Sequence, residues 1–217
     1  RLITLAWRDN PFCGSTFGSG SGLTRKGFEL VEACESARVL VDASHASDLA
    51  FADICRVATR PFIASHSNCR ALCPSGRNLT DAMIREIAER GGVLGITLAP
   101  GFLSADYHAQ TRAAEEEFWR SVESGAMTVD EAGKKCAEAE ASVPRPPLDL
   151  IVDHVRHAIN IAGEDAVGLG GDLDGVDVLP AGMDVPAEIG TYLDECGYGA
   201  GALPPGGRTR IPSPSCR

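Results

Sequence analysis

The chain has 217 residues, of which 44% are hydrophobic and 23% are charged, a composition typical of a globular protein with a substantial core. The formal net charge is −10 and there is no cluster of Lys and Arg. We therefore expect no nucleic-acid partner, because phosphate binding needs clustered positive charge. No apolar stretch reaches the ~18 uncharged residues that indicate a membrane helix.

Short apolar runs alternate with amphipathic segments along most of the chain. The first run, at residues 2–6, is followed by a loop over 13–22 that is rich in Gly and Ser. Apolar runs that close on a polar residue just before a helix are typical of buried strands in parallel sheets. By this criterion the sequence predicts five strands, at residues 2–6, 39–45, 61–66, 93–98 and 166–172.

The segments between these strands have the apolar spacing of amphipathic helices. Thr24, Ser47 and Thr80 each occupy an N-cap position, where a hydroxyl can accept a hydrogen bond from an amide of the first turn. A fourth helix is predicted over residues 150–162. The predicted inward faces are Phe28, Val31 and Cys34 in the first helix, Phe51, Ile54 and Val57 in the second, Met83, Ile84, Ile87 and Ala88 in the third, and Ile151, Val155 and Ile159 in the fourth.

Residues 105–141 are charged and mainly helical, so we interpret them as an insertion that adds no strand. Phe118 and Trp119 are its predicted anchors, and the acidic run Glu115–Glu117 is predicted to be a solvated helix face rather than a site. Alternating strands and helices favour an α/β fold with a parallel sheet, and five strands are fewer than the eight of a closed (β/α)₈ barrel.

The sequence therefore predicts a partial (β/α)₈ TIM-like barrel over residues 1–184, with a helical insertion at about 105–141. The remaining residues, 185–217, are rich in Pro, Gly, Ser and Arg and have no apolar period. Such a composition cannot bury enough apolar surface to fold, so we predict a poorly ordered or aberrant tail.

Three of the predicted strands end on side chains that suit metal chemistry, namely His45, His66 and Asp172. The carboxyl ends of parallel strands meet at one rim of a barrel, so we expect these three side chains to lie together. Imidazole is a common transition-metal ligand, and two histidines that bind one zinc ion should have nitrogens ~3–4 Å apart.

Other polar groups near these strand ends have less direct interpretations. Asp42, inside an apolar strand, either orients a ligand histidine or bonds to a neighbouring loop. Asp174 is predicted to be structural. The remaining histidines, His108, His154 and His157, lie in the insertion or on the last helix and are not predicted to be ligands.

The eight cysteines admit three interpretations, which the sequence leaves open. They are buried thiols, disulfides of a secreted chain, or thiolate metal ligands. Cys69 and Cys73 have a spacing that suits half of a zinc site, but no second pair at ligand spacing accompanies them.

Six sequence blocks occur in order along the chain, and they are Gly22-Leu23-Thr24-x-x-Gly27, Val41-Asp42-Ala43-Ser44-His45-Ala46-Ser47, Ala64-Ser65-His66-Ser67-Asn68, Gly76-Arg77-Asn78-Leu79-Thr80-Asp81, Asp153-His154 and Gly168-Leu169-Gly170-Gly171-Asp172-Leu173-Asp174-Gly175. Taken together, these blocks resemble the membrane (renal-type) dipeptidases, peptidase family M19, over residues 2–184. This family has an amidohydrolase-like barrel, so the resemblance implies that fold class for the partial barrel.

The resemblance implies a zinc-dependent dipeptidase with two Zn²⁺ ions in each complete site. His45 and His66 match the two strand-end histidines that hold one of the ions. Arg77 matches the arginine that binds the carboxylate of the dipeptide substrate. Asp172 matches the catalytic aspartate that acts on the attacking water and the leaving amine.

The chain also departs from the family pattern. The HxD pair and the bridging Glu that complete the metal site have no counterpart here, and would lie before Arg1. Trp7 stands where some members carry a substrate-binding histidine. We therefore expect an internal fragment that is inactive by itself.

Two other functions stay open. One is another metal-dependent hydrolase on the same barrel, such as an enzyme that uses a carbamylated Lys, although Lys26, Lys134 and Lys135 all lie outside the predicted strand ends. The other is a non-catalytic barrel fragment. A homodimer is the assembly we consider for the full-length protein. The compartment is undetermined, with the cytoplasm favoured because no signal or anchor is visible.

Overall fold

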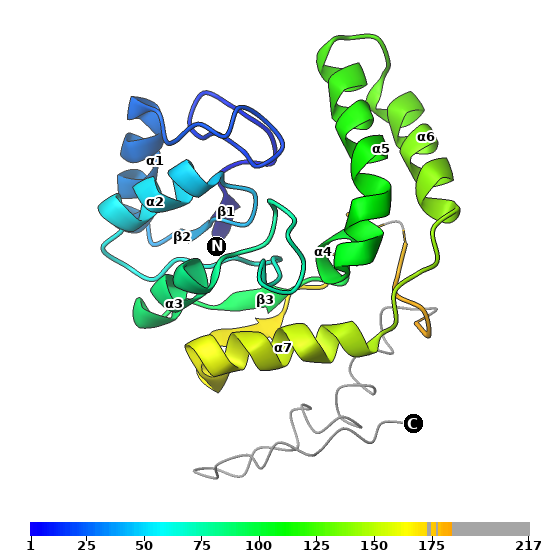
Figure 1. Ribbon diagram of the computed structural model, residues 1–217. Helices are drawn as coiled ribbons and strands as arrows, with labels where there is room; N and C mark the ends of the chain where they lie inside the picture. Colours follow the sequence, from blue (N-terminus) through cyan, green and yellow to red (C-terminus); the bar gives the residue numbers. More distant parts are fainter. Residues whose placement is uncertain (173–174, 177, 184–217) are drawn as a thin grey trace.

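The computed structural model describes residues 1–172, 175–176 and 178–183 of the chain (Figure 1). Asp174 and the predicted tail, 185–217, lie outside the described residues. Four short strands and several helices alternate along the chain, which confirms the predicted α/β class. The strands are β1 (Leu2–Thr4), β2 (Leu40–Asp42), β3 (Leu94–Ile96) and β4 (Val167–Leu169).

The strands run parallel and follow one another across the molecule in chain order. β1 pairs with β2, and β3 pairs with β4, both in parallel register. Single parallel bridges, Asp42 to Ile63 and Ala64 to Leu94, link the two pairs through the segment 63–64. Five parallel segments therefore lie side by side. No closed barrel forms within the part of the chain that the structure describes.

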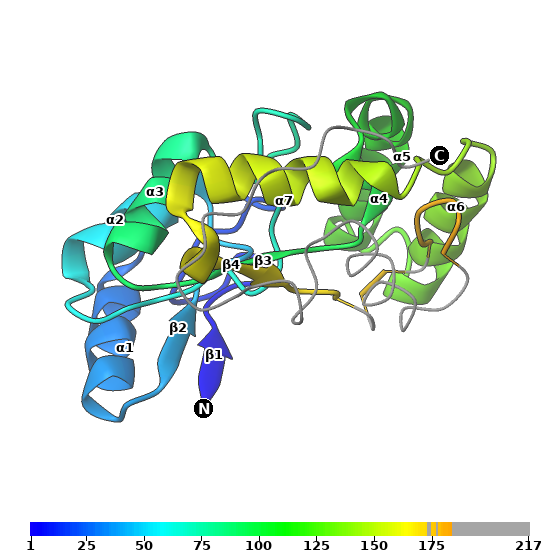
Figure 2. The same ribbon diagram turned by 90° about the horizontal axis from the view of Figure 1, so that it is seen from below.

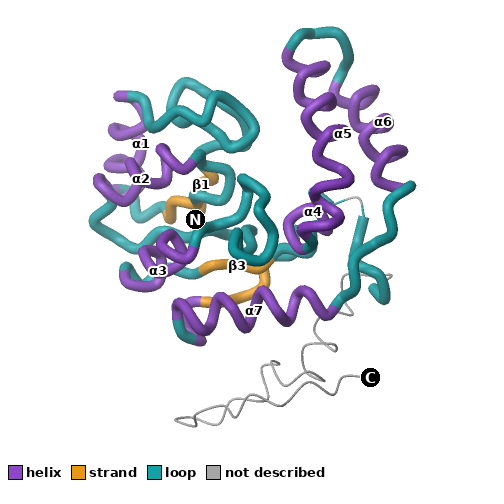
Figure 3. The backbone as a smooth tube through the Cα atoms, viewed as in Figure 1, coloured by secondary structure: helices purple, strands orange, loops and turns teal. Residues whose placement is uncertain are grey.

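The observed strands are shorter than predicted, and Figure 3 shows long loops between them. The run 39–45 leaves the strand after Asp42, because the Ser44 amide bonds to the Asp42 carboxylate at 3.1 Å instead of to a neighbouring strand. The run 61–66 forms only the two bridges, because the Ser65 amide also turns to Asp42, at 2.9 Å. One carboxylate thus ends both runs and leaves the histidines on the turns that follow.

Helices cover the outside of these strands, and the three predicted N-caps are confirmed. Thr24, Ser47 and Thr80 each accept a hydrogen bond from an amide in the first turn of the helix they precede. Figure 2 shows the fourth outer helix, α7, running alongside β3 and β4. The bounds are α1 (Arg25–Ser36), α2 (Asp48–Val57), α3 (Asp81–Glu89) and α7 (Asp149–Ala162).

The core lies between these helices and the strands. The side chains of Val31, Ile54, Ile84 and Ile151 are buried in it, one from each of the four helices, as the apolar spacing predicts. Phe28, Val57 and Met83 are only partly buried and pack against its edge. A short 3₁₀ helix, η1 (Glu164–Ala166), connects α7 to β4.

The insertion is a helical hairpin that projects away from the strands (Figure 1). A one-turn helix that the sequence does not predict, α4 (Pro100–Leu103), leads into α5 (Ala105–Glu123), and α6 (Val129–Ala141) returns antiparallel to it. Thr128 and Glu131 form a reciprocal capping box at the start of α6, which fixes the turn of the hairpin.

An aromatic cluster joins this hairpin to the N-terminal loop. The Trp119 ring stacks on Phe17 with ring centroids 5.2 Å apart and meets the edge of Trp7 at 5.3 Å. Arg8 lies 4.9 Å above the same ring and pairs with Glu123 at 3.0 Å. Trp119 is therefore the anchor of the insertion, as predicted.

All the described cysteines are free, and they are Cys13, Cys34, Cys55, Cys69, Cys73 and Cys136. Burial raises the pKa of the Cys13 thiol and of the Cys69 thiol to about 12, so both are protonated at neutral pH. The interpretation as buried thiols holds for Cys13, Cys34, Cys69 and Cys73, whereas Cys55 and Cys136 are only partly buried. Cys196 and Cys216 lie outside the described residues. No helix of the described part of the chain is both long and apolar enough to cross a membrane.

His154 is a buried strut between α7 and two loops. Its Nδ1 accepts a hydrogen bond from the Cys69 amide at 3.0 Å, and its Nε2 lies 3.0 Å from the Leu103 carbonyl oxygen. Burial lowers the pKa of this imidazole, so the ring is neutral and can accept at one nitrogen and donate at the other.

Replacing His154 with Ala should lower the free energy of unfolding by about 2–4 kcal/mol, since it leaves a cavity and two unpaired backbone groups. Urea denaturation measures this loss. His157→Ala is the matched control, because His157 is partly exposed on the same helix and, among the described residues, its ring bonds to the Asp81 carboxylate. The control should lose less than about 1 kcal/mol. Equal losses in the two variants would contradict the role of His154 as a strut.

Candidate metal and substrate site

A cavity of about 500 Å³ lies between the ends of the strands and the helical hairpin. His45, His66 and Asp172 all line it, so the structure brings together the three residues that the sequence places at strand ends. They come from loops after three different parallel segments. The opposite wall consists of residues of α4, α5 and α6.

The two imidazoles that line this cavity are in contact with each other. His45 Nε2 and His66 Nε2 are 2.8 Å apart, and the ring centroids are 4.9 Å apart. This separation is that of a hydrogen bond, and it is shorter than the ~3–4 Å expected for two nitrogens that share one zinc ion. The rings would separate slightly to admit an ion between them.

The buried side chain of Asp42 links the two loops that carry His45 and His66. The side chain is 1% exposed, and its carboxylate accepts hydrogen bonds from both the Ser44 and Ser65 hydroxyl groups at 2.6 Å, and from Thr4 at 2.8 Å. Burial alone would raise the pKa of this carboxyl, but the hydrogen bonds outweigh burial and lower it. Asp42 is therefore ionised and fully bonded in the core.

This network determines the tautomer of His66. Ser65 Oγ lies 2.7 Å from His66 Nδ1, while its own proton is donated to Asp42. Because that proton is already used, the hydroxyl oxygen accepts from His66, and Nδ1 carries the hydrogen. His66 Nε2 then holds a lone pair, as metal-binding histidines need, and at 2.8 Å this lone pair accepts a hydrogen bond from His45 Nε2.

His45 is also held as a neutral ring. Burial, together with the nearby charge of Arg77, lowers the pKa of His45 to about 2. Its Nδ1 is buried and has no hydrogen-bond partner among the described residues. Two neutral imidazoles supply suitable nitrogen ligands. Within the described residues, however, no group of three or more His, Cys, Asp or Glu side chains is placed to hold a metal ion.

Asp172 completes this side of the cavity. Its Oδ2 lies 4.0 Å from His66 Nε2, and its backbone has a positive φ of 56°, which aspartate tolerates better than most residues. A Cβ at Gly175 would lie 2.7 Å from Asp172 Oδ1, so glycine at this position leaves room for the carboxylate. This close approach explains why the last sequence block ends in a glycine, Gly175.

Arg77 is buried behind the cavity wall, with 2% of its surface exposed. Its guanidinium donates to the Ser44 carbonyl oxygen and, at 3.0 Å, to the His66 carbonyl oxygen. Phe17 and Phe102 lie against its charge at 5.9 and 5.2 Å. Burial lowers the pKa of Arg77 to about 10, so it remains charged at neutral pH.

Arg77 is predicted to bind the substrate, but it does not lie on the surface of the cavity. Among the described residues, Phe17 and Phe102 line the cavity and Arg77 does not. Two of its N–H groups are bonded to the backbone of the histidine loops, and its Nε has no hydrogen-bond partner among the described residues.

The structure corrects the interpretation of one acidic residue in the insertion. The run Glu115–Glu117 is predicted to be solvated, but Glu115 lines the cavity opposite His45. Burial, followed by the charges of Glu140 and Glu116, raises the pKa of Glu115 to about 7. Sequence spacing does place Glu115 one turn before Trp119 on the helix, and that shared face is the signal that could have identified it.

Comparisons with known proteins identify the family of the chain. The family described as membrane dipeptidase (peptidase family M19) matches residues 1–195. An uncharacterized protein in the pqqA 5′ region of Klebsiella pneumoniae is 35% identical over 158 residues, which cover 73% of this chain and 46% of that protein. The chain spans less than half the length of the curated relatives considered.

Two solved structures resemble the fold. A metallo peptidase from Rhodobacter sphaeroides, liganded with a phosphinate mimic of the dipeptide L-Ala-D-Ala, has a TM-score of 0.67 and 25% identity, and the match covers 90% of this chain and 49% of that one. An amidohydrolase from Pseudomonas aeruginosa has a TM-score of 0.58 and 19% identity, with 85% and 44% covered. The second likeness concerns the fold alone, and it agrees with the expected amidohydrolase-like architecture.

Proposed function

The chain belongs to the membrane dipeptidase family, peptidase family M19, and we propose that the whole protein is a zinc-dependent dipeptidase. The observation that carries this proposal is the pair of facing imidazoles beside Asp172 in one cavity. The bound dipeptide mimic of the Rhodobacter sphaeroides metallo peptidase supports a dipeptide as the substrate.

His45 and His66 are the residues that would hold a zinc ion. Both rings are neutral, and the Asp42–Ser65 chain keeps the hydrogen of His66 on Nδ1, so that Nε2 is the nitrogen that could bind an ion. A zinc ion at such a site acts as a Lewis acid on the peptide carbonyl and lowers the pKa of water. The HxD pair and the bridging Glu of a complete two-zinc site have no counterpart in these 217 residues.

Asp172 is the proposed catalytic acid and base. Its carboxylate is 4.0 Å from His66 Nε2 and reaches into the same cavity. From this position it can accept a proton from the attacking water and deliver it to the leaving amine. Glycine at position 175 leaves room for the carboxylate in this orientation.

Arg77 is proposed to bind the carboxylate of the dipeptide, as the family resemblance implies. Its charge lies directly behind Phe17 and Phe102. A substrate carboxylate can therefore reach the guanidinium only if these rings move aside. Its hydrogen bonds to the Ser44 and His66 carbonyl oxygens give it a second task, which is to hold the two histidine loops together.

The lysines argue against a hydrolase that uses a carbamylated Lys. The chain has three, and Lys26 lies in α1 while Lys134 and Lys135 lie in α6. Their side chains are exposed and do not line the cavity. A bridging carbamate at a strand end would therefore have no source within this chain.

Zinc binding tests the proposed site directly. We expect the reduced 217-residue chain to bind Zn²⁺ weakly, because catalytic zinc normally has three protein ligands and only two are placed here. His45→Ala and His66→Ala should each abolish this binding in calorimetric titration, and His157→Ala should leave it unchanged. If both cavity variants bind zinc as well as the parent chain, the proposed metal site is wrong.

A further inference from the structure

The hairpin wall of the cavity is made by one face of each of its two helices. Positions three, four and seven residues apart share one face of a helix. The lining residues have this spacing, and they are Glu115, Phe118 and Trp119 on α5, and Gly133, Cys136, Ala137 and Glu140 on α6. Large rings from one helix and small side chains from the other therefore line the same space.

Gly133 keeps this space open beside the Phe118 ring. A Cβ at position 133 would have one neighbour within 4 Å, which is Phe118 Cε2 at 3.9 Å, an ordinary van der Waals contact. No close contact in the described part of the chain therefore requires glycine here, although glycine in a helix interior is less stable than alanine. What the glycine provides is room in the cavity next to an aromatic ring.

Aromatic rings are concentrated around this cavity. The chain has two Trp, three Tyr and seven Phe. Six of these twelve residues line the cavity, namely Trp7, Phe17, Phe102, Tyr107, Phe118 and Trp119. The Phe118 ring meets Trp119 edge to face at 4.7 Å, and Trp119 stacks on Phe17, so these three rings form a continuous wall. All three are partly exposed, which leaves ring surface accessible to a ligand.

The environment of Glu115 at this end of the cavity disfavours charge. Burial, followed by the charges of Glu140 and Glu116, raises the pKa of the Glu115 carboxyl to about 7, so it is partly protonated at neutral pH. Glu140 accepts a hydrogen bond from Cys136 Sγ, at 3.7 Å on its own helix. Surroundings that destabilise a carboxylate by burial suit an uncharged, apolar ligand.

We propose that the hairpin end of the cavity, lined by Phe118, Trp119, Gly133 and Ala137, is an aromatic subsite, and that the preferred substrates are dipeptides with an aromatic side chain. This inference rests on the proposed dipeptidase function and specifies its substrate class. The same cavity of about 500 Å³ is lined by His45, His66 and Asp172 at its strand side. A dipeptide whose peptide bond lies beside these three residues can therefore place one side chain against the hairpin.

A phenyl ring suits the aromatic subsite for two reasons. It removes a large apolar area from water when it is buried, which is the main source of affinity in apolar pockets. It is also flat, so it can pack edge to face against Phe118 in the space that Gly133 leaves. A methyl group in the same place would leave most of the ring surface in contact with water.

Equilibrium binding of probes with a blocked, uncharged backbone tests the proposal without metal and without turnover. Nα-acetyl-phenylalanine N-methylamide carries the ring, Nα-acetyl-alanine N-methylamide lacks it, and Nα-acetyl-lysine N-methylamide carries a cation instead. We expect the phenylalanine probe to bind about 10- to 100-fold more tightly than the alanine probe, because burial of an aromatic side chain contributes a factor of this size. NMR titration of the 217-residue chain measures these affinities.

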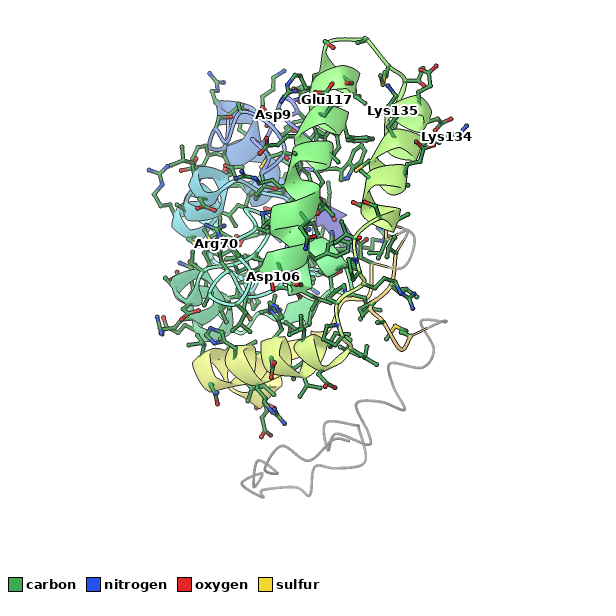
Figure 4. All side chains as sticks on the ribbon, turned by 45° about the vertical axis from the view of Figure 1, so that its right-hand side comes forward. Asp9, Arg70, Asp106, Glu117, Lys134 and Lys135 are labelled. Carbon is green, nitrogen blue, oxygen red and sulfur yellow. The ribbon has the colours of Figure 1, made fainter. Side chains whose placement is uncertain are left out.

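Variants assign the preference to the hairpin. Gly133→Leu should remove it, because the leucine side chain fills the aromatic subsite, and leucine forms helix better than glycine does. Lys134→Leu is the matched control, since it adds the same side chain at the next residue, which is exposed and does not line the cavity (Figure 4). Phe118→Ala should weaken binding of the phenylalanine probe by about 3- to 10-fold. Circular dichroism of each variant checks its fold.

Three results would overturn the proposal. The first is equal binding of the phenylalanine and alanine probes to the parent chain, a comparison that needs no variant. The second is a preference for the phenylalanine probe that a folded Gly133→Leu variant retains, which would place the ring elsewhere. The third is tighter binding of the lysine probe than of the phenylalanine probe. Each leaves the zinc titration unaffected, so a failure of the substrate class is distinguishable from a failure of the dipeptidase assignment.

Discussion

Replacing Asp172 with Asn lowers kcat for dipeptide hydrolysis by about 10²- to 10⁴-fold in an active preparation of the whole protein. Asn has nearly the same shape but cannot accept or deliver a proton, and general acid–base groups contribute factors of this size. The substrate KM should change little, because the proton is transferred only in the transition state. Steady-state kinetics with a dipeptide measures both parameters.

Asp106→Asn provides the matched control for this experiment. Asp106 is an exposed carboxylate in the first turn of α5 (Figure 4), and it does not line the cavity. Its variant should retain the parent kcat. A kcat in Asp172→Asn within a few-fold of the parent value would remove Asp172 from the proposed chemistry.

Replacing Asp42 with Asn lowers zinc affinity by about 10- to 100-fold while the chain remains folded. In the parent chain, the Ser65 proton goes to Asp42, so His66 donates from Nδ1. An amide NH₂ in place of Asp42 Oδ2 donates to Ser65 instead. The Ser65 proton then turns to His66 Nδ1, and the hydrogen of His66 moves to Nε2, where it blocks the metal.

The measurements for this variant are zinc titration and the ¹⁵N chemical shifts of the imidazole, which report the tautomer. Thr4→Val is the control, because it removes one hydrogen bond to the same carboxylate oxygen and leaves the contact between Ser65 and His66 in place. It should keep the tautomer and most of the zinc affinity. An unchanged tautomer in Asp42→Asn, together with parent zinc affinity, would contradict the network.

The local parts of the fold could be predicted from the sequence. Thr24, Ser47 and Thr80 cap their helices as expected, because an N-cap hydrogen bond depends only on residues within one turn. The lengths of the strands could not be predicted in the same way. They depend on Asp42, whose carboxylate takes the Ser65 amide from a segment 23 residues away.

The residues of the candidate site likewise include some that could be predicted from the sequence and some that could not. His45, His66 and Asp172 could be grouped because parallel strands direct their ends to one side. Glu115, Glu140 and Tyr107 could not, because their place in the cavity depends on how the hairpin packs against the N-terminal loop. The motif of Arg77 predicts a contact with the substrate, whereas its burial and its bonds to two backbone carbonyl oxygens follow from the tertiary fold.

The contact between Trp7 and Trp119 gives the molecule an internal optical reporter. These are the only two tryptophans of the chain, and both lie where the hairpin meets the N-terminal loop. Their indole rings are in edge contact, and Arg8 lies above one of them. The intrinsic tryptophan fluorescence of the whole chain therefore originates at the mouth of the cavity, and it will follow the docking of the hairpin without any added label.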